Sequence, residues 1–144
     1  MSISRQNLSV VIVTLKSENV IHECIKSINQ NIPIIVVENS NNINFKRKIE
    51  KSYRNIKCYL TGSNIGYARA NNIGLRKVKT KFALVINPDV IISSKQVKQI
   101  ENIAKQTMQC FLSSKTNTLL FRSYYSTVVL NRFALRTYHV NTTS

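Results

Sequence analysis

A chain of 144 residues with 43% hydrophobic content is large enough for one domain around one core. Its 21 Lys and Arg against 6 Asp and Glu give a formal net charge of +15, which favours weak attraction to anionic surfaces and phosphorylated ligands. No apolar run reaches the roughly 18 residues of a membrane-spanning helix. The N-terminus lacks the basic region, apolar core and cleavage site of a secretory signal.

Three cysteines, at positions 24, 58 and 110, are scattered and do not have CxxC spacing. This spacing argues against a disulfide framework and against a zinc site. Cys24 falls on the apolar face of an expected helix, where a free cysteine behaves as a small core residue. We therefore expect a protein of a reducing compartment, the cytoplasm.

The first third of the chain predicts two strands with a helix between them. Leu8–Thr14 is a β-branched apolar run, typical of a strand that is buried on both faces. Apolar residues then recur at helical spacing from Val20 to Ile28. Pro33 precedes a second expected strand at Ile34–Val37, and the polar run Glu38–Asn42 is typical of a turn.

The alternation continues through the middle of the chain. We expect a short basic helix, a strand, a helix, a buried strand and a further helix, at Phe45–Tyr53, Ile56–Leu60, Tyr67–Val78, Phe82–Ile86 and Ser94–Ala104. Strands that alternate with helices predict an α/β fold with a mostly parallel sheet and right-handed crossovers.

The last third has a different composition. No acidic residue follows Glu101, Ser and Thr become dense, and no Gly or Pro interrupts the segment. Strands are possible at Thr118–Phe121 and Ser126–Leu130. A variable substrate-binding region would explain the change, and so would a chain that was cut short or shifted out of frame near Gln109–Thr118. We favour the second explanation, which an uninterrupted longer reading frame would contradict, and expect a nucleotide-binding part at 1–105 and a divergent or truncated segment at 106–144.

Polar residues follow three of the expected strands, and ligands of open α/β sheets bind at the carboxyl ends of strands. Thr14 ends the first strand, Glu38 follows the second, and Asn87 and Asp89 follow the fourth. A carboxylate at such an end can hold a divalent metal, which can hold a diphosphate. Each candidate has an ordinary alternative. The loop that begins at Thr14 could simply cap a helix, Glu38 could be an exposed acid in a turn, and Asp89 could lie in a simple turn.

The segments Asn64-Ile-Gly66 and Asn72-Ile-Gly74 bracket the start of an expected helix. Gly66 lets the backbone turn tightly or approach a ligand, and a helix N-terminus suits phosphate. Arg69, in the first turn, adds a charged donor. The alternative is a capped helix with an outward-facing arginine.

Taken together, these residues resemble the nucleotide-sugar-binding half of an inverting family 2 glycosyltransferase with the GT-A fold. The resemblance covers Leu8 to Ala104 and is strongest to the rhamnosyltransferase-like branch of cell-surface polysaccharide enzymes. It is carried, in order, by SVVIVTLKSE, VVENS, NIGYARANNIG and NPDV. It implies a Rossmann-like, mostly parallel sheet flanked by helices and incomplete on the C-terminal side.

The resemblance also implies roles for single residues. Thr14 and Glu38 would contact the nucleoside, and the segment from Asn64 to Gly74, with Gly66 and Asn72, would follow the nucleotide and its diphosphate. Asp89 would match the last acid of the DxD-like motif and bind Mg²⁺ or Mn²⁺.

This chain departs from the family pattern at three places. Asn87 replaces the first acid of the metal motif. Asn71 replaces the arginine of an Arg-Asn-x-Gly sequence, so the role of that arginine is unfilled or falls to Arg69. The family's general base lies far beyond the metal motif, where this chain has no Asp or Glu, so we assign no catalytic residue.

An intact relative would transfer a sugar from a UDP- or dTDP-sugar, with inversion, to a glycan or lipid-linked acceptor. For this chain we expect donor and metal binding, with activity in doubt. The alternatives are a basic nucleic-acid-binding α/β domain and a non-functional fragment. Nucleic acid is not favoured, because the lysines do not form one stripe and no aromatic platform accompanies them.

Overall fold

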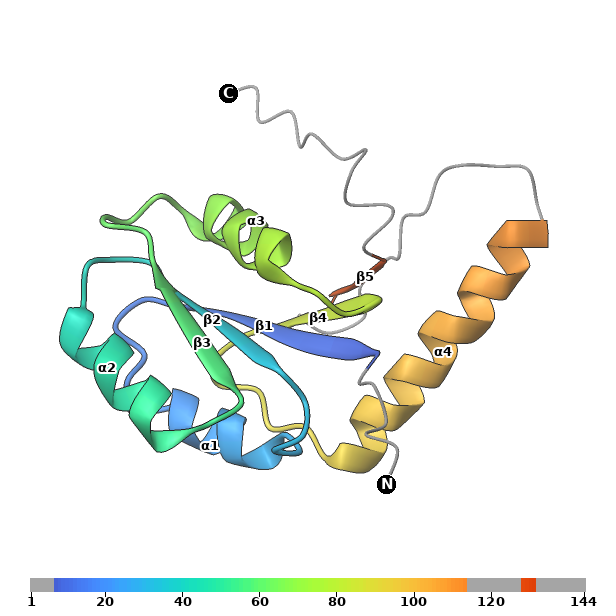
Figure 1. The fold of residues 1–144 in the computed structure, drawn as a ribbon, viewed down its shortest axis with the longest axis horizontal. Coiled ribbons are helices and arrows are strands. Elements are labelled where there is room, and N and C mark those ends of the chain that lie inside the picture. Colours follow the sequence, from blue (N-terminus) through green and yellow to red (C-terminus); the bar gives the residue numbers. More distant parts are fainter. Residues whose placement is uncertain (1–6, 114–127, 132–144) are drawn as a thin grey trace.

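The computed structural model describes residues 7–113 and 128–131 (Figure 1). The strands are β1 (Leu8–Thr14), β2 (Ile34–Glu38), β3 (Ile56–Leu60), β4 (Phe82–Ile86) and β5 (Val128–Asn131). The helices are α1 (Ile21–Ser27), α2 (Ile43–Ser52), α3 (Tyr67–Lys77) and α4 (Ser94–Ser113). The predicted alternation of strand and helix is therefore confirmed.

The five strands form one sheet in the order β3-β2-β1-β4-β5. The first four are parallel and β5 runs antiparallel to β4. Thr14 is the register partner of Glu38, and Ile12 is the partner of Ile86, so β1, β2 and β4 end at the same edge. The chain adds β2 and β3 on one side of β1 and then crosses to add β4 on the other side. The gap between the ends of β1 and β4 is thus the topological switch point, where open α/β sheets bind ligands.

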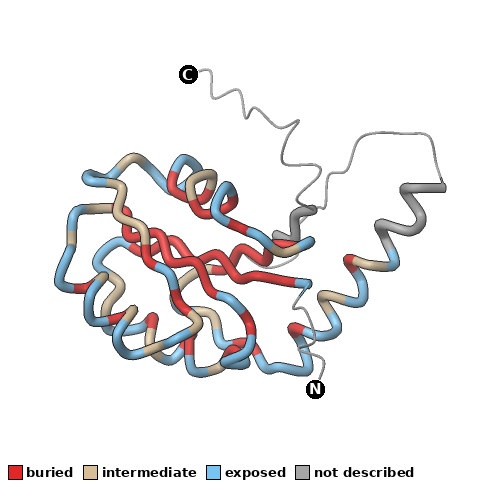
Figure 2. The backbone as a smooth tube through the Cα atoms, viewed as in Figure 1, coloured by how far each residue is buried: buried red, intermediate tan, exposed pale blue. Residues whose placement is uncertain are grey.

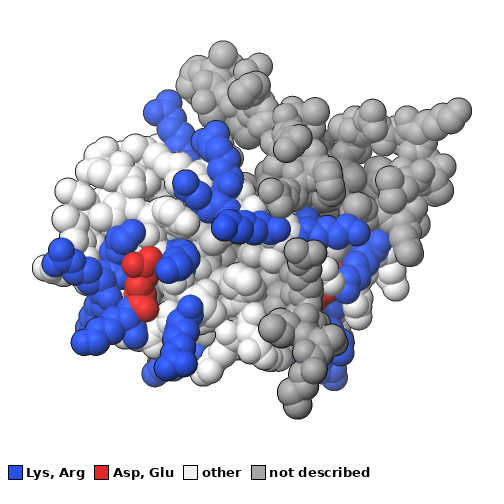
Figure 3. Space-filling view, in the orientation of Figure 1, with Lys and Arg blue, Asp and Glu red and all other residues white. Residues whose placement is uncertain are grey.

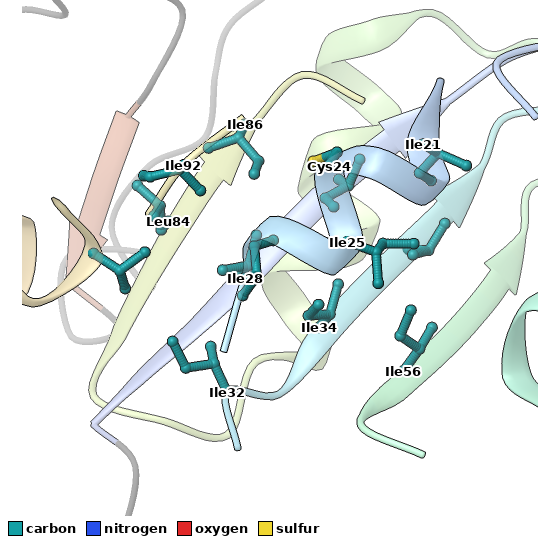
Figure 4. Close-up of a cluster of buried hydrophobic side chains, with 14 of the residues drawn as sticks. Ile21, Cys24, Ile25, Ile28, Ile32, Ile34, Ile56, Leu84, Ile86 and Ile92 are labelled. Carbon is teal, nitrogen blue, oxygen red and sulfur yellow. The ribbon is translucent and has the colours of Figure 1, made fainter. Parts of the chain in front are cut away.

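Helices cover both faces of the sheet (Figures 1 and 2). Residues from α1, α2 and α4 pack with alternate strand residues on one face, and α3 packs with the intervening strand residues on the other. Figure 4 shows the first cluster, in which isoleucines of α1 meet those of β2, β3 and β4. Strands enclosed in this way need apolar residues at successive positions, which explains their continuous β-branched runs.

Helix α3 lies close to the sheet because Gly74 has no side chain. A Cβ atom at Gly74 would lie 2.5 Å from Cγ1 of Val11 and 3.0 Å from Cγ2 of Val37. Both distances are shorter than ordinary contacts between carbon atoms. The glycine therefore allows α3 to lie close to β1 and β2.

The structure differs from expectation mainly at element ends. Strand β2 includes Glu38, and α4 continues to Ser113 instead of ending at Ala104. The helix thus runs through residue 105, and the domain boundary expected there stays a prediction. Of the two late strands, the second overlaps β5, which pairs with β4, whereas Thr118–Phe121 lies outside the described residues.

Candidate functional site

The ends of β1, β2 and β4 and the start of α3 form an edge that we call the carboxyl rim. Backbone hydrogen bonds join the loops that leave neighbouring strands. The amide of Asn39 donates to the carbonyl of Thr14 (2.7 Å), and that of Thr61 donates to the carbonyl of Glu38 (3.1 Å). The sheet pairing thus extends past the strand ends and positions the side chains of the rim.

Thr14 and Glu38 lie side by side at the rim, and each is only 1% exposed. Glu38 Oε1 accepts a hydrogen bond from the Ser40 hydroxyl, but Glu38 Oε2 and Thr14 Oγ1 are buried without a partner among the described residues. Buried polar atoms without partners cost free energy. A ligand that supplies a donor and an acceptor here would remove that cost.

Burial raises the pKa of the Glu38 carboxyl above its ordinary value, and the nearby Glu18 carboxylate raises it further. The hydrogen bond from Ser40 acts in the opposite direction. A carboxyl whose pKa is raised by desolvation and by a like charge is more common at binding and catalytic sites than elsewhere. The raised pKa supports a functional role for Glu38. The alternative of an exposed acid in a turn does not fit, because Glu38 is buried.

Glu18 also lines a hollow of about 470 Å³ between the loop before α1 and helix α2. Its carboxylate accepts a hydrogen bond from the side chain of Asn42, which caps α2 through the amide of Phe45. The link between this hollow and the carboxyl rim is electrostatic, because the Glu18 carboxylate contributes to the raised pKa of Glu38.

Asn39, a residue that the sequence reasoning did not select, joins β2 to the start of α3. It is 3% exposed, and its Nδ2 donates to Asn64 Oδ1 over 3.0 Å. Its Oδ1 accepts from the amide of Ile65, also at 3.0 Å. Asn64 Oδ1 in turn accepts from the amide of Gly66. The one feature of the sequence that could have drawn attention to Asn39 is its position directly after Glu38, the acid that ends a buried strand.

Gly66 precedes α3 with a φ of 83°, a conformation that favours glycine. No atom lies within 4 Å of where its Cβ would be, so the backbone angle rather than crowding requires glycine here. No side chain caps this helix end. Its first amides therefore remain available to an anion, as the dipole of an 11-residue helix favours.

Tyr67, the first residue of α3, contacts the end of β4. Its hydroxyl donates to Asn87 Oδ1 over 2.8 Å. The sequence reasoning selected Asn87 but not Tyr67. Periodicity could not find this pair, because the contact depends on β4 lying beside β1.

Asp89 is exposed and lies in a turn closed by a hydrogen bond from the Val90 amide to the Asn87 carbonyl. Burial raises the pKa of Cys24 in α1 to about 11, and the nearby Asp89 contributes to that shift. No group of three His, Cys, Asp or Glu among the described residues could hold a metal ion. Asp89 thus offers a single carboxylate.

The structure brings together Thr14, Glu38, Asn64, Gly66 and Asn87 along the rim, and Asp89 follows within two residues of Asn87. Two predicted residues have no such contact: Arg69 is exposed and Asn72 half-buried, and no hydrogen bond joins either side chain to another described residue. Asn71, by contrast, is buried, and its Oδ1 has no partner in the part of the chain that is described.

Figure 3 shows Lys and Arg side chains dispersed over the face in view rather than forming a stripe. Among the described residues, every helix is too short or too polar to cross a bilayer.

Comparisons with known proteins agree on one family. The model of the family "Glycosyl transferase family 2" matches residues 9–134. The low-salt glycan biosynthesis hexosyltransferase Agl10 of Haloferax volcanii is 28% identical over 113 residues, which cover 76% of this chain and 36% of that protein.

Solved structures agree on the fold. TarS of S. aureus (residues 1–349), in complex with UDP-GlcNAc, superposes with a TM-score of 0.60 at 22% identity, over 70% of this chain and 32% of that one. The mannosyltransferase PcManGT of Pyrobaculum calidifontis, in complex with GDP-Man and Mn²⁺, gives a TM-score of 0.50 at 15% identity, over 58% and 27%. The chain thus spans about a third of the length of these relatives.

Proposed function

Because the chain belongs to glycosyl transferase family 2 and has the GT-A fold, we propose that its carboxyl rim binds a nucleotide-diphosphate sugar together with a divalent metal. One observation carries the proposal. Glu38 and Thr14 are register partners beside the switch point of the sheet, and each has a buried polar atom without a partner among the described residues. Strand ends of this kind are where ligands of α/β sheets bind.

The nucleoside would occupy the place beside Thr14 and Glu38. The free Oε2 of Glu38 accepts a hydrogen bond from the imide N–H of a base such as uracil or thymine, and the Thr14 hydroxyl donates to a carbonyl or ribose oxygen. Adenine and cytosine lack this imide N–H and offer an exocyclic amino group instead, at a different position on the ring. This chemistry supports a UDP- or dTDP-linked donor.

The diphosphate would lie at the N-terminus of α3. Free first-turn amides and the helix dipole attract it, and the bonds from Asn39 and Asn64 hold the preceding loop in place. Arg69, in the first turn of α3, and Asn72, one turn further on, add donors that are not engaged by another described residue.

Asp89 would hold the metal, Mg²⁺ or Mn²⁺, beside Asn87. A single exposed carboxylate fits these ions, since Mg²⁺ is commonly bound through one or two carboxylates, substrate phosphates and waters. When bound, the metal neutralises charge on the departing diphosphate. Asp89 alone should bind metal weakly, so the diphosphate and the metal should each strengthen the binding of the other.

For the whole enzyme we propose sugar transfer with inversion to a glycan or lipid-linked acceptor, in the synthesis of cell-surface polysaccharide. The support is the family and the hexosyltransferase relative, of which this chain covers about a third. The rhamnosyltransferase-like branch stays a prediction.

Isothermal titration calorimetry of the full chain tests the binding proposal. With Mn²⁺ present, we expect saturable heat with UDP and dTDP and weaker binding of ADP and CDP. Absence of heat with every nucleotide would overturn the proposal. A parallel titration with single-stranded DNA tests the nucleic-acid alternative, which predicts salt-sensitive binding that is indifferent to Asp89.

A further inference from the structure

Building on the nucleotide binding proposed above, we infer that Tyr67 is a positioning residue: it fixes the Asn87 side chain so that its NH₂ group, and not its oxygen, is left for the diphosphate. The Tyr67 hydroxyl donates to Asn87 Oδ1 over 2.8 Å. The Nδ2 of Asn87 has no hydrogen-bond partner among the described residues, although the side chain is half-buried.

The two ends of an amide side chain have opposite chemistry. Oδ1 accepts hydrogen bonds and can bind a metal, whereas Nδ2 can only donate. Once Tyr67 occupies the oxygen, Asn87 presents two N–H donors, which suit a phosphate oxygen and do not suit a cation. A carboxylate in place of Asn87, as in the two-acid metal motif, would attract a cation and repel a phosphate oxygen.

The rest of the Asn87 residue is also held in place. Its carbonyl accepts from the amide of Val90 (3.2 Å) and lies 3.8 Å from the Cys24 thiol. The side chain is therefore the only part of the residue left to rotate, and Tyr67 restricts it from the other side of the rim. The hydroxyl links the first residue of α3 to the end of β4 across the place assigned to the diphosphate.

This arrangement changes the charge that a diphosphate meets. Asp89 contributes one negative charge, while Asn87, the α3 amides and Arg69 contribute donors. A site with two carboxylates would repel a metal-free diphosphate more strongly. We therefore expect part of the affinity for a nucleoside diphosphate to persist when the metal is removed.

The test is calorimetry of UDP binding to the full chain, once with EDTA and once with Mn²⁺. Relative to wild type, Tyr67→Phe should weaken UDP binding about 5-fold in EDTA, the loss expected for one hydrogen bond. Asn87→Asp should weaken binding about 10-fold or more in EDTA and regain most of it with Mn²⁺, because a carboxylate repels the diphosphate and attracts the metal.

Tyr53→Phe is the matched control. It also removes a tyrosine hydroxyl that bonds a side chain, His22 Nδ1 at 3.0 Å, but away from the carboxyl rim. Its UDP affinity should equal that of wild type in both buffers. Thermal melts of all variants establish that each is folded. If Tyr67→Phe does not fold, Asn87→Asp tests the inference alone, because its carboxylate still accepts the hydrogen bond from Tyr67.

Three outcomes would contradict the inference. If wild type binds UDP and Tyr67→Phe binds it equally well, even with a lower melting temperature, Tyr67 is a structural contact only and the proposed function stands. If Asn87→Asp binds UDP in EDTA as wild type does, the amide does not face the diphosphate. If wild type binds no nucleotide, the proposed function fails and this inference fails with it.

Discussion

The side-chain amide of Asn39, buried directly after β2, donates to Asn64 Oδ1 over 3.0 Å, joining two residues that lie 25 positions apart. The other end of the same amide accepts from the backbone of Ile65. One side chain thus fixes the loop that leads into α3 against the end of β2. The free amides of the helix, proposed to meet the diphosphate, depend on this loop for their position.

Replacing Asn39 by alanine should lower the free energy of unfolding by about 1–3 kcal/mol, because the half-buried amide of Ile65 loses its acceptor. Urea denaturation followed by circular dichroism measures the change. Asn44→Ala, at an exposed position of α2, is the control and should be nearly neutral. Equal midpoints for the two variants would show that the bonds of Asn39 contribute little.

Gly74→Ala should destabilise the domain by about 1–3 kcal/mol, since a methyl group cannot fit between α3 and Val11 without moving the helix. Helix propensity alone predicts the opposite sign, a gain of up to about 1 kcal/mol. Chemical denaturation therefore separates the two effects by sign. In a double-mutant cycle, Val11→Ala should remove part of the penalty, and simple additivity would contradict the close contact.

Glu38→Gln should stabilise the protein at neutral pH while weakening nucleotide binding. The pKa of Glu38 is raised in the folded state by burial and by Glu18, so the folded state holds its proton to a higher pH than the unfolded state. Stability must then fall as pH rises from the ordinary glutamate pKa through the raised one. Glutamine carries no charge and avoids that loss.

The measurement is unfolding free energy against pH, from about pH 4 to about pH 8. The difference between Glu38→Gln and wild type should grow with pH and vanish at the acid end. Glu23→Gln, at an exposed position of α1, provides the control for removal of one negative charge. If the stability advantage of Glu38→Gln over wild type shrank as pH rose, the pKa of Glu38 would be lowered in the folded state, not raised.

Asp89→Asn should abolish the part of UDP affinity that Mn²⁺ adds and leave the metal-free affinity equal or slightly higher. The reason is that Asp89 is the carboxylate assigned to the metal and otherwise repels the diphosphate. Calorimetry with and without Mn²⁺ checks both statements, with Glu23→Gln again as the control. An unchanged response to Mn²⁺ would exclude Asp89 as a metal ligand.

The sequence was sufficient to predict the strands and helices and to select most of the residues of the carboxyl rim. Continuous β-branched runs predict strands enclosed on both faces. Thr14, Glu38 and Asn87 were selected because they stand at the carboxyl ends of such strands, where open α/β sheets bind ligands. The ordered motifs then indicated the family, which the family model confirms. The roles assigned to these residues, and the truncation of the chain, stay predictions.

Partners in space could not be predicted in the same way. Periodicity reports which face of an element is buried, but not which element covers it. Asn39 and Tyr67 were missed because each bonds a residue on a different segment. Asn71, a residue of α3, was missed because its burial depends on how that helix lies on the sheet.

The sequence by itself thus determined that strands and helices alternate and that polar groups stand at the strand ends, because local spacing and side-chain type fix both. Only the tertiary structure decided that β4 lies on the opposite side of β1 from β2, which creates the switch point and brings Asn87 to Tyr67. The order of strands is chosen by packing between residues far apart in the chain, and no local pattern records that choice.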